Sequence, residues 1–76
     1  MKIELLGAGC SKCVQLEEVV KQAIMKSAKH VELEKVEDIM RIMQYQVLST
    51  PALVVDGKVV STGRVLSVDE VLEYIN

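Results

Sequence analysis

The hydrophobic pattern of the chain changes its period several times, and these changes divide the chain into seven predicted elements. Short runs rich in valine, isoleucine and leucine have the composition of strands. The second of these runs alternates apolar with charged residues, which is typical of a strand near a sheet edge. Asp56-Gly57 separates the last two runs and predicts a tight hairpin. The predicted strands span residues 3–6, 31–36, 52–55 and 59–61.

A helical period follows the first predicted strand. From Cys13 onward, apolar residues recur at the spacing of one helix face. Glu17, Glu18 and Lys21 occupy the other side, where we expect them to be solvated, with Glu17 and Lys21 forming an ion pair one turn apart. The apolar positions of this predicted helix are Leu16, Val19, Val20, Ala23 and Ile24.

Two further helices are predicted. The segment 37–46 places Ile39, Ile42 and Met43 on one stripe with Met40 beside it, and we expect both methionines to fill the core. The last helix begins after Ser67, because Glu70 three residues later completes a capping box. The predicted order is therefore β-α-β-α-β-β-α.

Composition narrows the class of protein. A chain of 76 residues forms one small domain, and half of its residues are hydrophobic. The net charge of −2 and the two tyrosines as sole aromatic residues argue against nucleic acid as a partner. Neither a signal-peptide pattern nor a run long enough to span a bilayer is present, so we expect a cytoplasmic protein that does not bind membranes.

Cys10 and Cys13 are the residues most suited to chemistry. They stand three positions apart, where a glycine-containing segment ends and a helix begins, so that both face the same side of the first turn. The free N–H groups and the dipole at a helix N-terminus favour a thiolate, and we expect Cys10 to be the more exposed thiol and Cys13 the more buried one. The residues alone leave two uses open, a redox-active disulfide or a two-thiolate site for a soft ion such as Cu(I).

Four segments together resemble the thioredoxin-like fold. The sequence most resembles the small redox-active disulfide proteins of archaea and bacteria, which have the size of a thioredoxin or glutaredoxin. The resemblance covers the whole chain and implies a single α/β domain, residues 1–76, with a four-stranded mixed sheet, two helices on one face and one on the other. The chain departs from familiar thioredoxins in having Gly9 before the first cysteine and Ser11-Lys12 between the two. The segments that carry the resemblance are Gly9-Cys10-Ser11-Lys12-Cys13, Thr50-Pro51, the hairpin at 52–59 and Gly63-Arg64.

The resemblance also implies a site. Thr50-Pro51 would be a cis peptide beside the sulfurs, and its backbone edge would pair with an extended substrate segment. The loops 8–12, 49–51 and 62–64 would meet there. The implied substrate-binding residues are Gly9, Ser11, Lys12, Thr50, Pro51 and Gly63.

The implied activity is thiol–disulfide exchange. Cys10 would attack a partner disulfide and Cys13 would resolve the mixed disulfide, with no cofactor and no metal. The expected partners are protein disulfides and a thioredoxin-reductase-like electron donor, and we expect a monomer. The departures within the cysteine motif leave the direction of electron flow open.

A metal carrier is the rival from another class. Small copper-chaperone domains have a similar length and a Gly-x-x-Cys-x-x-Cys loop that leads into a helix. Their elements follow the order β-α-β-β-α-β, and the chain ends in a strand. The predicted terminal helix and the Thr50-Pro51 pair have no place in that scheme.

Overall fold

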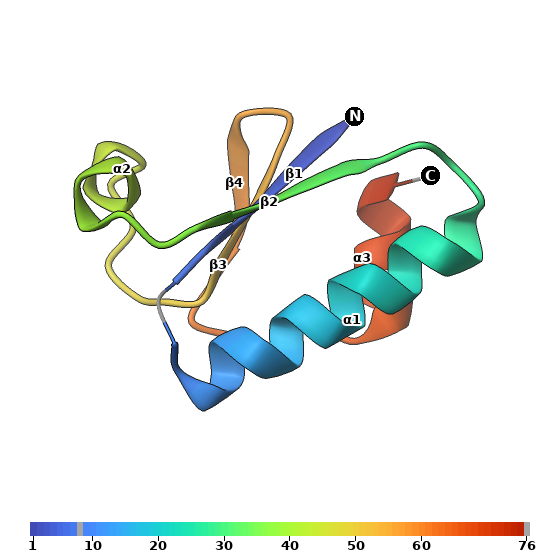
Figure 1. Ribbon diagram of the computed structural model, residues 1–76, viewed down its shortest axis with the longest axis horizontal. Helices are drawn as coiled ribbons and strands as arrows, with labels where there is room; N and C mark the ends of the chain where they lie inside the picture. Colours follow the sequence, from blue (N-terminus) through green and yellow to red (C-terminus); the bar gives the residue numbers. More distant parts are fainter. Residues whose placement is uncertain (8, 76) are drawn as a thin grey trace.

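The computed structural model describes residues 1–7 and 9–75. It contains the seven elements in the predicted order (Figure 1). The strands are β1 (Lys2–Leu6), β2 (Glu32–Val36), β3 (Ala52–Val55) and β4 (Lys58–Thr62), and the helices are α1 (Ser11–Ser27), α2 (Ile39–Gln44) and α3 (Val68–Ile75).

The four strands form one mixed sheet in the order β2-β1-β3-β4. β1 pairs with β2 in parallel, whereas β1 with β3 and β3 with β4 are antiparallel. The alternating strand β2 lies at an edge, as its sequence predicts. Asp56 and Gly57 both adopt positive φ angles at the β3–β4 turn, which matches the twist of the hairpin.

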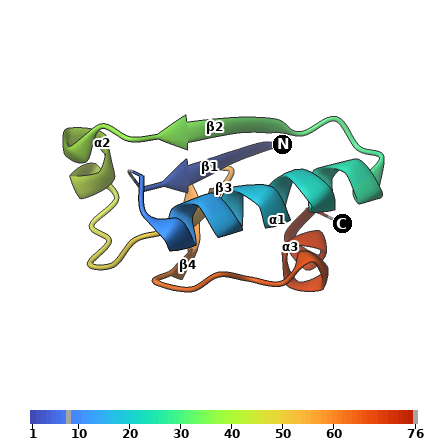
Figure 2. The same cartoon turned by 60° about the horizontal axis from the view of Figure 1, so that its bottom comes forward.

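Helices cover both faces of the sheet (Figure 2). α1 and α3 pack side by side on one face, where they form the larger apolar core with β1 and β3. The predicted capping box starts α3, because the Glu70 amide donates to Ser67 Oγ at 3.2 Å and the Ser67 amide donates to Glu70 Oε1 at 3.0 Å. The fully buried residues of the larger core include Ile3, Leu16, Val20, Ala23, Leu53 and Val71.

The smaller helix α2 lies on the opposite face, and its packing differs from the prediction. Ile39, Met40 and Met43 remain 64–67% exposed, so the expectation that both methionines fill the core is wrong. α2 is only six residues long and contains no buried residue. Ile42 and Tyr45 are the side chains of this segment that pack against the smaller apolar cluster of β1, β2 and β3.

Polar contacts attach α2 to the sheet instead. The Tyr45 hydroxyl donates a hydrogen bond to the carboxylate of Glu4, whose two oxygens lie 2.8 and 2.9 Å from the hydroxyl oxygen. Arg41 pairs with Glu34 at 2.7 Å and with Glu4 at 3.4 Å. Glu4 is buried in the middle of β1, so a charged side chain within the sheet holds this helix in place.

Candidate redox site

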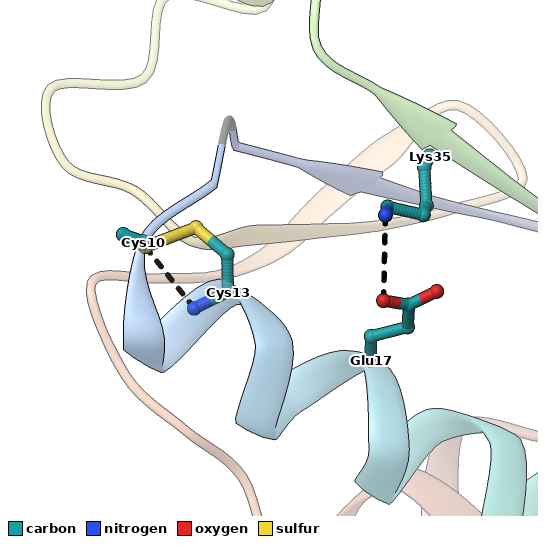
Figure 3. Close-up of a disulfide and its surroundings, with 4 residues drawn as sticks. All are labelled: Cys10, Cys13, Glu17 and Lys35. Carbon is teal, nitrogen blue, oxygen red and sulfur yellow. Dashed lines mark hydrogen bonds and ion pairs between the residues drawn. A yellow bond between two sulfur atoms is a disulfide. The ribbon is translucent and has the colours of Figure 1, made fainter.

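The two cysteines lie at the junction of β1 and α1. Cys10 is the N-cap of α1, and Cys13 follows in the first turn (Figure 3). They form a disulfide with Cα atoms 5.1 Å apart. The Cys13 amide donates to Cys10 Sγ at 3.1 Å, which satisfies one of the free donors of the helix N-terminus. A thiolate at Cys10 would accept the same hydrogen bond and lie at the positive end of the helix dipole.

The two sulfurs differ in their access to solvent. Cys10 is half-buried, whereas Cys13 is only 6% exposed. This is the difference that the first-turn spacing predicts, since the second cysteine points back toward the sheet. Only Cys10 is therefore placed to meet a partner molecule first.

Gly7 provides the space in which the second sulfur lies. A Cβ atom added at Gly7 would lie 2.5 Å from Cys13 Sγ and 3.7 Å from Pro51 Cα, and Gly7 has a φ of +154°, which side-chain-bearing residues rarely adopt. A Cβ added at Gly9 would meet no atom within 4 Å. Gly7 therefore makes room for the second thiol, whereas the space next to Gly9 is open.

The proline loop adjoins the sulfurs. The Thr50–Pro51 peptide bond is cis, Pro51 is buried, and Thr50 is exposed. The Gly63 amide donates to the Pro51 carbonyl at 2.8 Å, and a Cβ at Gly63 would lie 3.1 Å from Ser49 Cβ. The 62–64 loop therefore supports the 49–51 loop, which in turn reaches Gly7 beside Cys13.

The remaining predicted site residues are exposed neighbours of Cys10 in the sequence. Gly9 is exposed before Cys10, Ser11 begins α1, and Lys12 is exposed to solvent. Of the predicted loop 8–12, Ala8 lies outside the described residues.

Sequence reasoning missed a polar feature beneath the disulfide. A cavity of about 40 Å³ opens there, between α1 and the end of β2. Glu17 and Lys35 both line it, and Lys35 Nζ lies 3.4 Å from Glu17 Oε1 (Figure 3). Lys21 Nζ lies 3.3 Å from Glu17 Oε2. The expectation that Glu17 is solvated is wrong, because its side chain is only 16% exposed. The sequence signal was its position four residues after Cys13, on the same helix face.

The electrostatics of Glu17 follow from these neighbours. Burial acts to raise the pKa of Glu17, but the hydrogen bonds and charges of Lys21 and Lys35 outweigh it and lower the pKa below its usual value. Glu17 is therefore ionised at neutral pH.

The fold separates the two uses that the cysteine spacing left open. The described elements follow the order β-α-β-α-β-β-α, with the helix α2 between β2 and β3, whereas the copper-chaperone order has no helix between its second and third strands. A proline loop beside the two sulfurs is what the resemblance to thioredoxin-like proteins implies, and it has no counterpart in the copper-chaperone scheme. In the described residues 1–7 and 9–75, no helix is long and apolar enough to cross a membrane.

Comparisons with known proteins agree with this assignment. A family model described as a thioredoxin domain matches residues 1–76. A thioredoxin from Methanothermobacter thermautotrophicus is 32% identical over 76 residues, covering all of this chain and 99% of the relative. A thioredoxin from Methanocaldococcus jannaschii is 37% identical over 73 residues, covering 96% of this chain and 84% of the relative. The chain therefore belongs to the thioredoxin family, and it is a thiol–disulfide oxidoreductase that works through its Cys-x-x-Cys pair.

Proposed function

We propose that Cys10 is the attacking thiol and Cys13 the resolving thiol in the exchange of electrons with protein disulfides. The observation that carries this proposal is the asymmetry at the start of α1. Cys10 is only partly buried and its Sγ accepts the hydrogen bond of the Cys13 amide, whereas Cys13 is buried. The same hydrogen bond that caps the helix stabilises a thiolate at Cys10.

The reaction proceeds in two exchanges. The Cys10 thiolate attacks one sulfur of the partner disulfide, a Cys10–partner bond forms, and the other partner sulfur leaves as a thiolate. Cys13 then loses its proton and attacks Cys10 Sγ, which forms the Cys10–Cys13 disulfide and releases the second partner sulfur. The partner gains two electrons and the protein loses two. A reductase with thioredoxin-reductase-like chemistry returns the protein to the dithiol.

The proline loop supplies the surface for the partner segment. Pro51 has no N–H, and its carbonyl already accepts from Gly63, so an extended segment would pair with the backbone of exposed Thr50. Gly9 precedes Cys10, Ser11 and Lys12 follow it, and all three are exposed, so they would contact the partner chain beside Cys10. The absence of a Cβ at Gly9 leaves room for the partner chain to approach.

The proposed setting is the cytoplasm, with the protein acting as a monomer. Two cysteines in a Cys-x-x-Cys motif suit a reducing compartment, where a dithiol can be regenerated continually. Curated relatives named thioredoxin support protein disulfides and a reductase as partners.

The test is disulfide reduction by the purified protein in the presence of dithiothreitol, with insulin as the substrate. We expect Cys10→Ser to abolish turnover and Cys13→Ser to accumulate a mixed disulfide, which mass spectrometry of the intact complex detects. Full activity of Cys10→Ser would show that the attacking thiol has been assigned wrongly.

A further inference from the structure

Gly7 lies where the chain leaves β1, and a side chain at this position would meet the second sulfur. The residue is buried, and its amide donates to the Val36 carbonyl at 3.1 Å, so its backbone is attached to the end of β2. A Cβ atom at Gly7 would lie 2.5 Å from Cys13 Sγ, closer than Cβ atoms come to other atoms in folded proteins, and 3.7 Å from Pro51 Cα. Because backbone surrounds the position on both sides, a methyl group there requires that the sulfur move.

The sulfur can move in one redox state and not in the other. In the disulfide, Cys13 Sγ is bonded to Cys10 Sγ, and the first turn of α1 holds the two Cα atoms 5.1 Å apart (Figure 3). In the dithiol, the Cys13 side chain can turn about its Cα–Cβ bond to another staggered position. The cavity of about 40 Å³ that Cys13, Gly7 and Val14 help to line exceeds the roughly 10–15 Å³ that one water requires, so it offers space for a sulfur that has turned away.

A side chain at position 7 would therefore disfavour the disulfide more than the dithiol. Glycine has the opposite effect, because the space that the bonded sulfur occupies stays free. The backbone angle of Gly7, with a φ of +154°, does not change this comparison. A strain that the backbone bears in both redox states cancels from the equilibrium between them, whereas contact with the bonded sulfur does not.

We propose that Gly7 is a positioning residue that shifts the Cys10–Cys13 couple toward its disulfide and so makes the dithiol a stronger reductant. The proposal rests on the role assigned above to Cys13 as the resolving thiol. In that step Cys13 loses its proton to water, the Cys13–Cys10 bond forms, the Cys10–partner bond breaks, and the partner sulfur leaves as a thiolate with the electron pair. Gly7 keeps free the position that Cys13 Sγ takes as this bond forms.

The experiment measures the redox equilibrium of the full chain. The unmodified protein and Gly7→Ala are equilibrated at about pH 7 in graded mixtures of reduced and oxidised dithiothreitol, where one protein disulfide and one reduced dithiothreitol exchange for one protein dithiol and one oxidised dithiothreitol. Free thiols are then alkylated, and mass spectrometry gives the oxidised fraction. We expect the equilibrium constant for disulfide formation to fall about tenfold in Gly7→Ala, which makes the two-electron reduction potential about 30 mV less negative.

Gly57→Ala is the matched control. Gly57 also has a positive φ, of +85°, and a Cβ there would meet no atom within 4 Å, so this variant adds a methyl group and backbone strain far from the sulfurs. Its reduction potential should equal that of the unmodified protein. A potential of Gly7→Ala that is unchanged or more negative would overturn the proposal, and so would an equal shift in Gly57→Ala.

A second pair of variants decides the matter if Gly7→Ala does not fold. Cys13→Ala removes the atom that a Cβ at Gly7 would meet. Adding Gly7→Ala should therefore lower the urea midpoint less in Cys13→Ala than in the oxidised protein with both cysteines. Equal losses in the two backgrounds, or failure of both Gly7→Ala proteins to fold, would overturn the proposal, because the backbone at Gly7 would then set the cost. An error in the roles of the cysteines shows separately, as full activity of Cys10→Ser, since the redox equilibrium does not depend on which thiol attacks.

Discussion

The two faces of the sheet hold their helices by different forces. On one face, α1 and α3 bury fully apolar side chains against β1 and β3, so the helix that carries the cysteines is fixed by close packing. On the other face, α2 buries no residue and is attached through Arg41 and Tyr45 to carboxylates of β1 and β2. Packing of apolar surface is independent of pH and direction, whereas charged hydrogen bonds depend on both.

This difference separates the reacting sulfurs from the loop that meets the partner. The sulfurs lie at the end of the firmly packed helix α1. The loop from Tyr45 to Pro51 continues from the polar-anchored α2 and carries exposed Leu48 and Thr50. We expect the α2 side to open locally more readily than the α1 side, because it buries fewer apolar contacts.

The largest expected effect comes from truncating a buried side chain on the α1 face, which leaves a cavity in the core. Leu16 is fully buried between α1 and the sheet, so Leu16→Ala should lower the free energy of unfolding by about 2–5 kcal/mol. Urea unfolding followed by circular dichroism measures this loss. Val14→Ala on the same helix is the control, because Val14 is 52% exposed, and it should change stability by no more than about 0.5 kcal/mol. A small effect of Leu16→Ala would show that packing does not fix α1.

A smaller effect is expected from the polar anchor of α2. Tyr45→Phe removes the hydroxyl that donates to Glu4, a carboxylate whose side chain is only 8% exposed, and should cost about 1–3 kcal/mol. Hydrogen exchange should show faster opening of α2 amides than of α1 amides. The matched control is Tyr74→Phe, since Tyr74 is 40% exposed on α3. Equal losses for the two variants would contradict an anchoring role for the Tyr45 hydroxyl.

The smallest expected effect is on the pH dependence of the free energy of unfolding, and it again involves the α2 face. The hydrogen bonds that Glu34 accepts from Arg41 and Lys2 lower its pKa from 4.5 to about 2. A carboxyl whose pKa is depressed in the folded state stabilises the fold above its unfolded pKa, and this contribution is lost as the pH falls from about 4.5 to about 2. Glu34→Gln should therefore reduce the acid dependence of stability across this window.

The measurement is the urea midpoint between about pH 2 and pH 7 for the unmodified protein and two variants. Glu32→Gln changes an exposed residue of the same strand and is the control. The dependence of stability on pH that remains in Glu34→Gln comes from other carboxyls. One of these is Glu70, whose pKa is lowered chiefly by the hydrogen bond that it accepts from the Ser67 amide. Identical acid dependence in the Glu34 and Glu32 variants would contradict the expected contribution of Glu34.

The order of elements was predictable because it follows from local chemistry. The alternating run at β2, the Asp56-Gly57 turn and the Ser67–Glu70 capping box each depend on residues within a few positions of one another, and all three appear as expected. The helix ends were harder to predict. Ala28 and Gln46 adopt the left-handed conformation that glycine usually occupies, so nothing in their identity marked those positions.

The errors concern residues whose surroundings come from distant parts of the chain. Helical spacing placed Met40 and Met43 on an apolar stripe, but both stay exposed, and Ile42 and Tyr45 are the side chains that meet the smaller apolar cluster. Glu17 has the spacing of a solvated residue, yet Lys35 from β2 meets it across the cavity. Spacing along α1 places Glu17 on the same face as Cys13, but it cannot show that Lys35 from β2 lies opposite.

Hydrophobic period, turn chemistry and the three-residue spacing act within a single segment, so the amino-acid sequence alone predicts the seven elements and the thiol pair at the N-terminus of α1. The space that Gly7 leaves for the second sulfur, and the pairing of Glu17 with Lys35 at the cavity beside it, became visible in the folded protein. Those contacts join β1, β2, the proline loop and α1, and such contacts depend on sheet register and helix packing, which no local stretch of residues encodes.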